Sequence, residues 1–161
     1  MSEVESRLAD LGLALPPPFP LPSGLSLPFQ FVQVHGTRVL IAGHGPQAAD
    51  GSMAAPFGKL GTDLSVGEGY HAAQLVALSM LASLKRAIDD LDRVHQWHRV
   101  FGMVNSAPGF IQQPQVINGF SDLILKLYGS HRGAHTRSAV GMAELPFNIP
   151  VEIEGELSLY P

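Results

Sequence analysis

One arginine in this 161-residue sequence lies where a charged side chain needs an explanation. Arg137 sits among small and apolar residues in a segment that is typical of a strand. A salt bridge at the rim of a sheet is one explanation. The other is that its planar guanidinium binds a carboxylate at a subunit boundary, because two parallel hydrogen bonds both hold and orient such a ligand. Glu152, on the next strand along the chain, is then a candidate neighbour of Arg137.

The seven histidines raise the question of a metal site, since histidine is a common zinc and iron ligand. His95 and His98 fall in a predicted strand, where a separation of three puts their side chains on opposite faces. His131 and His135 flank a predicted loop and could share an ion with Glu144. We expect structural or surface roles for all of these histidines, and no metal.

Other catalytic signatures are missing from the sequence. It has no cysteine, which excludes disulfides, thiolate nucleophiles and cysteine-ligated zinc. It has no GxSxG motif, and Ser106 and Ser138 have no identifiable base. Gly67 and Gly69 precede Tyr70 at a predicted helix start, but the lysine of a phosphate-binding loop is absent, so we interpret this turn as a helix cap.

Composition limits the partners. The net charge of −4 and the scattered arginines argue against nucleic acid, because phosphate affinity comes mainly from Lys and Arg. Only 15% of the residues are charged, against roughly 25% in an average soluble domain, so we expect an apolar surface used in subunit contacts. The sequence contains neither an 18-residue apolar run nor a basic leader, which predicts no membrane span or secretory signal. A cytoplasmic location suits a chain without cysteine.

The elements that must position Arg137 begin after a lead segment, residues 1–28. This segment is predicted to form a short helix over Glu3–Leu11 and then an extended arm, because each proline fixes φ and removes a backbone donor. The prolines are Pro16, Pro17, Pro18, Pro20, Pro22 and Pro28. The arm either lies along the surface or acts as a peptide-like ligand for a partner domain. Residues 29–161 are predicted to form a single domain.

The domain begins with a hairpin of Phe31–Val34 and Arg38–Ala42. The loop 43–62 is longer than a compact domain usually leaves unstructured, which makes it a candidate binding or interface loop. Ser65, followed three residues later by Glu68, forms a capping box and predicts the start of a long amphipathic helix.

The second half of the domain repeats the alternation of strand and helix. Val94–Val104 is a predicted strand, Pro114 begins a second helix that Gly129 ends, and Arg137–Ala143 and 151–159 are the last two strands. The order ββαβαββ predicts an α+β fold with two helices on one face of a mixed sheet. The other face needs a cover, which predicts an oligomer.

Three segments resemble the RidA family (YjgF, reactive intermediate deaminase), formerly called endoribonuclease L-PSP. Residues 137–146 (RSAVGMAELP) and 151–154 (VEIE) look like its C-terminal signature, and 40–46 (LIAGHGP) is similar to its second strand and the following turn. The resemblance covers 29–159, about four-fifths of the chain. It is nearest to a divergent branch carrying residues 104–110 (VNSAPGF) and the proline-rich lead.

The resemblance implies a chorismate-mutase-like fold, a homotrimer with a central barrel, and sites in the clefts between subunits. The best-understood members hydrolyse 2-imino or enamino acids to 2-keto acids and ammonia, without a metal or organic cofactor. The family's carboxylate-binding arginine corresponds to Arg137 and its water-orienting glutamate to Glu152. A backbone donor near Gly43 and the side chain of Asn118 complete the expected contacts.

The sequence departs from the family pattern at several pocket positions. Ala42 stands where deaminating members carry serine, Ala139 where many carry cysteine, and Phe29 where they carry tyrosine. The expected pocket is therefore more apolar. His44 either supplies a replacement polar group or faces solvent in a turn.

The resemblance leaves three functions open. The first is an imine or enamine deaminase, and the second is a non-catalytic protein that binds a small carboxylate metabolite in the same cleft. The third is the RNA cleavage of the older family name. The acidic composition and the lack of a histidine pair with acid–base spacing argue against RNA cleavage.

Overall fold

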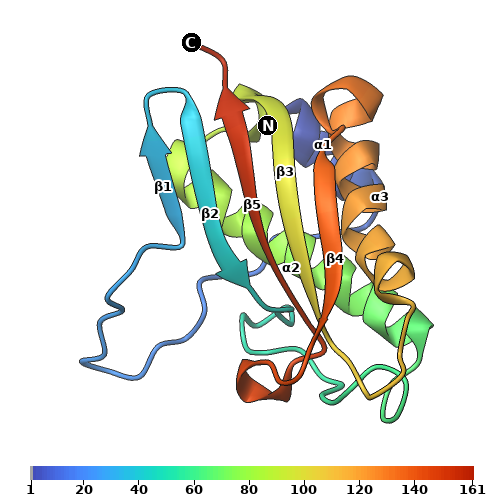
Figure 1. Cartoon of the computed structure of the whole chain (residues 1–161). Coiled ribbons are helices and arrows are strands. Elements are labelled where there is room, and N and C mark those ends of the chain that lie inside the picture. Colours follow the sequence, from blue (N-terminus) through green and yellow to red (C-terminus); the bar gives the residue numbers. More distant parts are fainter. Residues whose placement is uncertain (1) are drawn as a thin grey trace.

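A computed structural model describes residues 2–161 as one five-stranded sheet with two long helices on one face (Figure 1). The strands are β1 (Val32–His35), β2 (Arg38–His44), β3 (Val94–Asn105), β4 (Thr136–Met142) and β5 (Val151–Leu159). The helices are α1 (Glu3–Asp10), α2 (Val66–Ile88) and α3 (Gln113–Arg132), with short 3-10 turns η1 (Leu91–Arg93) and η2 (Pro146–Asn148). The predicted α+β class, the mixed sheet and the order ββαβαββ after α1 are confirmed.

The strand order β1-β2-β5-β3-β4 places the last strand of the chain at the centre of the sheet. β5 pairs antiparallel with both β2 and β3. β3 and β4 are parallel, because α3 carries the chain from the end of one strand back to the start of the other. As a result β4 is an edge strand, and β3 separates it from β5.

The two long helices begin as the sequence predicts. Ser65 caps α2, with its hydroxyl accepting from the backbone N–H of Glu68 (3.3 Å) and the Glu68 carboxylate accepting from the backbone N–H of Ser65 (2.8 Å). Pro114 lies in the first turn of α3. Gly129 breaks the helical conformation with a φ of 77°, and one more turn follows to Arg132, so the regular helix ends where predicted but the element runs slightly further.

The core lies between the sheet and its helices. Trp97 of β3 meets Phe120 of α3 edge-to-face, with ring centroids 5.8 Å apart. α2 and α3 touch backbone to backbone at Gly119, where an added Cβ would overlap the carbonyl oxygen of Tyr70 and lie 2.8 Å from its carbon. Only glycine permits this approach, so the angle between the helices depends on Gly119.

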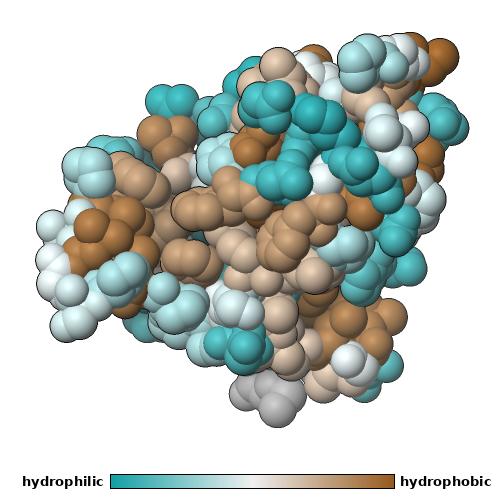
Figure 2. All heavy atoms as spheres, turned by 90° about the horizontal axis from the view of Figure 1, so that it is seen from below, coloured by the Kyte–Doolittle hydropathy of each residue, from teal (hydrophilic) through white to brown (hydrophobic). Residues whose placement is uncertain are grey.

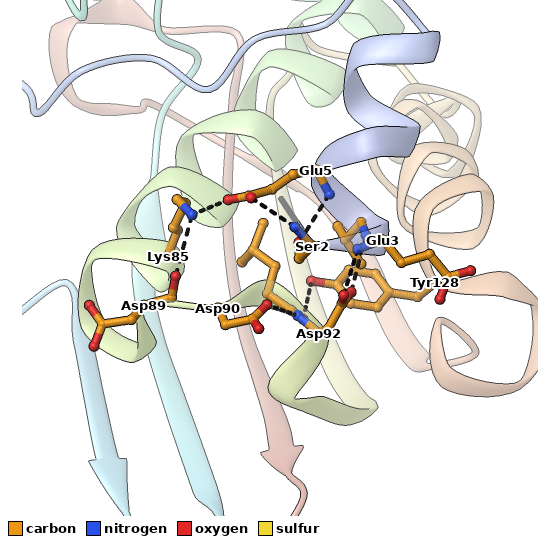
Figure 3. Close-up of polar contacts among 10 residues, drawn as sticks. Ser2, Glu3, Glu5, Lys85, Asp89, Asp90, Asp92 and Tyr128 are labelled. Carbon is orange, nitrogen blue, oxygen red and sulfur yellow. Dashed lines mark hydrogen bonds and ion pairs between the residues drawn. The ribbon is translucent and has the colours of Figure 1, made fainter.

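The predicted first helix forms and packs against the same core. Figure 3 shows the polar contacts that hold it in place. The backbone N–H groups of Glu3 and Val4 donate to the Asp92 carboxylate at 2.5 and 3.1 Å, which places a negative charge at the positive end of α1. Glu5 of α1 forms an ion pair with Lys85 of α2. Val4 and Leu8 are buried. The boundary at residue 28 between lead segment and domain stays a prediction.

The face of the sheet away from the helices is partly apolar. Its central strand presents a row of acidic side chains, Glu152, Glu154 and Glu156. Apolar residues flank this row in register, and they are Leu40, Phe101, Met103 and Val140. All four are half-buried even though no helix covers them.

The lower end of the molecule is formed by loops that lie side by side (Figure 1). The backbone N–H of Gly58 donates to the carbonyl of Asn148, which joins the loop 45–65 to η2. Exposed apolar side chains of this end are Phe57, Ile111 and Phe147. Figure 2 shows hydrophobic residues across the middle of the same end.

Within residues 2–161, the structure has no helix that combines the length and the apolar character needed to cross a membrane.

Candidate functional site

Arg137 is held by α3. It lies on β4 in register with buried Val100, so its side chain projects toward the helices. Its guanidinium donates to three neutral acceptors of α3: the carbonyl of Pro114 (3.2 Å), Oδ1 of Asn118 (2.6 Å) and Oγ of Ser121 (2.9 Å). The structure therefore brings together two of the predicted residues, Arg137 and Asn118.

The charge of Arg137 is not balanced by a carboxylate. Among the described residues, no acidic side chain lies within ion-pair distance of its guanidinium. Burial lowers the pKa of Arg137, and the more distant charge of Asp122 only partly opposes this effect. A half-buried cation surrounded by neutral dipoles is favourable for binding an anion.

Glu152 occupies a different environment. It lies on β5 in register with Met103, on the face of the sheet that the helices do not cover. Its carboxylate rests against Gly43 of β2, where an added Cβ would overlap Oε1 and lie 3.1 Å from the carboxyl carbon. Burial raises the pKa of Glu152, and the neighbouring charge of Glu154 adds to the rise. The structure thus also brings together Glu152 and Gly43.

The expectation that Glu152 lies beside Arg137 is wrong within one chain. β4 and β5 follow each other in sequence, but β3 lies between them in the sheet. Arg137 is in register with Val100, whereas Glu152 is in register with Met103, three residues further along β3. An odd separation on a strand reverses the face, so the two side chains point to opposite sides of the sheet.

His44 is an interior residue. It is 5% exposed, and its ring nitrogens lie 2.7 Å from the carbonyl of Ala42 and 2.9 Å from Oγ of Ser83. Burial lowers the pKa of His44 to about 4, so the ring is neutral near pH 7. His44 is therefore neither a solvent-facing turn residue nor a free polar group, because both nitrogens are used inside the subunit.

The remaining predicted residues lie near one or other of these groups. Ala139 is two residues after Arg137 on β4, shares its face and packs against the core. Phe29 precedes β1 and is half exposed, with its ring 5.4 Å from that of Phe31. The ring of Phe31 in turn lies 5.0 Å from His44. Both Ala139 and Phe29 contribute apolar surface, as their side-chain types suggested.

The expectation that His95 and His98 face opposite sides assumes regular alternation along β3, and it stays a prediction. β3 has a register shift against β5 at each of these histidines, so regular alternation does not hold there, and both side chains are exposed. Residues 2–161 contain no group of three or more His, Cys, Asp or Glu side chains placed to hold a metal ion.

Sequence reasoning missed two residues next to Arg137. Ser121 accepts a hydrogen bond from the guanidinium, and its hydroxyl also lies 2.9 Å from Nε2 of His135. The spacing of Ser121 from Asn118 was the available signal, since residues three apart share a helix face. The link to His135 could not be inferred, because it depends on how the turn after α3 folds back.

Comparison with known proteins gives matches over most of the chain. Residues 5–152 match the family described as "YjgF/chorismate_mutase-like, putative endoribonuclease". The chain is 44% identical to Protein TCP17 of Trypanosoma cruzi over 102 residues, which are 63% of this chain and 64% of TCP17. The match therefore spans less than two thirds of that relative.

Two solved structures are similar over nearly the whole chain. Atu1372 of Agrobacterium tumefaciens is 34% identical with a TM-score of 0.84, and the match covers 97% of this chain and 91% of that one. A Shewanella oneidensis MR-1 protein described as a "putative endoribonuclease" is 30% identical with a TM-score of 0.85, covering 97% and 99%.

Proposed function

The chain belongs to the YjgF/chorismate-mutase-like family, and we propose that it is a hydrolase of 2-imino or enamino acids. The products would be a 2-keto acid and ammonia. Escherichia coli TdcF, whose structure contains bound serine, shares this fold at 17% identity and a TM-score of 0.58. A small molecule carrying a carboxylate is the ligand class that we propose for this chain.

The observation that carries the proposal is the unbalanced charge of Arg137. Its guanidinium is half-buried, and its hydrogen-bond partners Pro114, Asn118 and Ser121 are all neutral. A substrate carboxylate would supply the missing negative charge and accept a charge-assisted hydrogen bond from a free N–H of Nη1 or Nε, which helps to position the ligand. A rim salt bridge, the competing explanation, has no partner among the described residues.

We propose that the site is completed by a second copy of the chain. Arg137 and Glu152 lie on opposite faces of the sheet, so one subunit cannot direct both at the same ligand. In a homotrimer, Arg137 and Asn118 of one subunit would face Gly43 and Glu152 of the next. The half-buried apolar residues of the uncovered face support such an assembly, because contact between subunits would remove them from water.

The proposed chemistry needs only water and these residues. Arg137 holds the substrate carboxylate, while Glu152 orients a water molecule against the carbon of the C=N bond and takes up its proton. The water oxygen bonds to this carbon, the C=N bond becomes a C–N single bond, and the proton on Glu152 passes to the nitrogen. The new hydroxyl group then loses its proton to the nitrogen as the C–N bond breaks, which forms the C=O bond of the 2-keto acid and releases ammonia. The raised pKa of Glu152 brings the carboxylate closer to the basicity that a general base needs.

Substitution of Arg137 tests this function directly. We expect Arg137→Gln to abolish ammonia release from a freshly generated imino acid and to weaken 2-ketobutyrate binding by at least tenfold, about 1.4 kcal/mol. Lys126→Gln is the matched control, because it removes a positive charge from the exposed side of α3. Equal activity of Arg137→Gln and wild type would contradict the proposal.

A non-catalytic carboxylate binder is the second candidate. Ala139 and Phe29 leave the proposed pocket with fewer polar groups than deaminating relatives carry. Thermal stabilisation by 2-ketobutyrate that depends on Arg137, without ammonia release, would favour this function.

RNA cleavage that survives Arg137→Gln and extensive purification would instead favour the endoribonuclease activity of the family description. For each of these three functions we propose a cytoplasmic location.

A further inference from the structure

We propose that Ser121 and His135 are positioning residues that hold the guanidinium of Arg137 in the orientation that binds a carboxylate. The proposal rests on the function proposed above, in which Arg137 contacts the substrate. It starts from a continuous chain of hydrogen bonds. Nη1 of Arg137 donates to Oγ of Ser121 at 2.9 Å, and Oγ of Ser121 lies 2.9 Å from Nε2 of His135. Nδ1 of His135 lies 2.7 Å from the carbonyl of Gly133.

The chemistry of these groups fixes the direction of each hydrogen bond. A carbonyl only accepts, so Nδ1 of His135 carries the hydrogen that points to Gly133. In a neutral ring Nε2 is then an acceptor, and the hydroxyl of Ser121 donates to it. The single hydroxyl hydrogen of Ser121 is thereby used, which leaves its lone pairs to face Arg137. By accepting the hydroxyl hydrogen, His135 therefore makes Oγ of Ser121 an acceptor for the guanidinium.

The acceptors also determine which donors of Arg137 stay available. Pro114, Asn118 and Ser121 are spaced four and three residues apart, so they form a row on one face of α3. They accept three hydrogen bonds from the two Nη atoms. A guanidinium has five N–H donors in roughly one plane. Two remain, the N–H of Nε and one N–H of Nη1, and they lie on different edges of the guanidinium. A ligand carboxylate therefore accepts from one of them, and it forms a parallel pair only by replacing Pro114 or Asn118 at Nη2.

The surroundings keep His135 neutral. Burial lowers the pKa of His135, and the charge of Arg137 lowers it further. Its ring packs edge-on against Phe120 with centroids 6.1 Å apart. The nearest acidic group on α3, Asp122, is engaged by the hydroxyl of Tyr70 from α2 at 2.9 Å. Protonation of His135 would point a second N–H at Oγ of Ser121 and place a second positive charge next to Arg137.

A serine within hydrogen-bond distance of a histidine is also the arrangement of a nucleophile and its base. Two observations favour positioning. Ser121 is 8% exposed, which leaves little room for a substrate at its hydroxyl. Its oxygen already accepts a hydrogen bond from Arg137, which reduces its ability to attack a carbon.

Substitutions in the chain of hydrogen bonds test the assignment. We expect Ser121→Ala and His135→Phe to raise both the KM for the imino acid and the Kd for 2-ketobutyrate about tenfold, equivalent to ~1.4 kcal/mol, with kcat changed less than twofold. His135→Asn can still accept from Ser121 and donate to Gly133, so it should restore most of the affinity. Exposed neighbours provide matched controls, Ser130→Ala and His131→Asn, which should match wild type.

The pH profile separates positioning from a purely structural role. We expect the Kd of wild type for 2-ketobutyrate to rise as pH falls through the pKa of His135, which burial places below its usual value, while this ligand stays ionised. His135→Asn does not titrate and should lose this rise. A profile that is identical in wild type and His135→Asn would overturn the proposal.

Failure of the proposed function can be distinguished from failure of positioning. If wild type neither binds 2-ketobutyrate nor releases ammonia, the proposed function fails. Positioning is then judged by ¹⁵N NMR of the side chains, where Ser121→Ala should shift the ring signals of His135 and the guanidinium signals of Arg137. Unchanged signals, unchanged Kd values in folded Ser121→Ala and His135→Phe, or a covalent adduct on Ser121 would each overturn it.

Discussion

The guanidinium of Arg137 and the carboxylate of Glu152 are both half-buried charged groups without an opposite charge at ion-pair distance in the described chain. Burial of an unpaired charge is unfavourable, which is why the pKa of Arg137 is lowered and that of Glu152 is raised. Groups with shifted pKa values often lie at functional sites, because a bound ligand can supply the opposite charge or the hydrogen bonds that the protein does not provide. Each residue is therefore expected to respond differently to substitution.

Glu152→Gln should separate turnover from binding. Glutamine keeps the shape of the side chain but cannot take up a proton from water, so we expect kcat to fall at least a hundredfold with little change in the Kd for 2-ketobutyrate. The raised pKa gives a second test. Wild-type kcat/KM should decline as pH falls through the pKa of Glu152, which lies above its usual value of 4.5, because the protonated carboxyl group cannot act as a base. Equal loss of binding and turnover would show that Glu152 has another role.

His44 makes the stability of the fold depend on pH. Its pKa is about 4 in the folded chain and 6.5 when unfolded, so between these values the unfolded chain binds more protons and stability falls as pH falls. The maximum loss is about 3 kcal/mol, and it is complete below about pH 4. Urea unfolding of wild type and His44→Gln at pH 7 and pH 5 measures it. His44→Gln should be less stable at pH 7 but less sensitive to pH, and equal sensitivity would contradict the assignment.

At the scale of elements, the site depends on two close backbone approaches. The Gly43 backbone of β2 accommodates the carboxylate of Glu152 from β5, next to the register shift between Ile41 and His44. Gly119 brings α3 against α2. α3 in turn supplies every acceptor that holds Arg137, so the position of the helix determines the position of the guanidinium.

Gly119→Ala should therefore disturb both stability and the site. The new methyl group would collide with backbone at Tyr70, which cannot rotate away, so we expect a loss of about 1–3 kcal/mol in the free energy of unfolding. Gly67→Ala is the control, since the nearest atom to its added Cβ is 3.9 Å away and alanine favours a helix. A Gly119→Ala protein as stable as wild type would show that the helices can separate without cost.

At the scale of the whole molecule, the uncovered face of the sheet carries apolar side chains that no helix of the same chain covers. It holds half-buried apolar side chains around a row of three glutamates. The loops at the lower end of the molecule add exposed side chains, among them Ile111 at 82% and Phe147 at 72% exposure. Burial of such surfaces between copies would also complete the proposed site.

Analytical ultracentrifugation tests the assembly. Wild type should sediment as a species of about three times the 17.2 kDa of one chain. Met103→Asp places a charge on the uncovered face beside Glu152, and we expect it to dissociate the trimer and abolish turnover together. Leu125→Asp, on the exposed side of α3, should remain a trimer. A wild type that is monomeric at all concentrations but active would refute the shared site.

The sequence alone determined the elements and their order, because hydrophobic periodicity, the Ser65 cap, Pro114 and Gly129 are local signals that short-range sterics and hydrogen bonding enforce. It also singled out Arg137 as an unusual charge in an apolar segment, and the family resemblance added Glu152. Local signals cannot specify which strands become neighbours, since strand pairing depends on how distant segments pack.

Only the tertiary structure decided that β5 inserts between β2 and β3, which moves Glu152 away from Arg137 and onto the other face. It also placed His44 in the interior against Ser83 and His135 next to Ser121. Both contacts depend on how the helices pack against the sheet. Contacts between residues far apart in sequence arise from packing, and their partners are therefore visible only once the chain is folded.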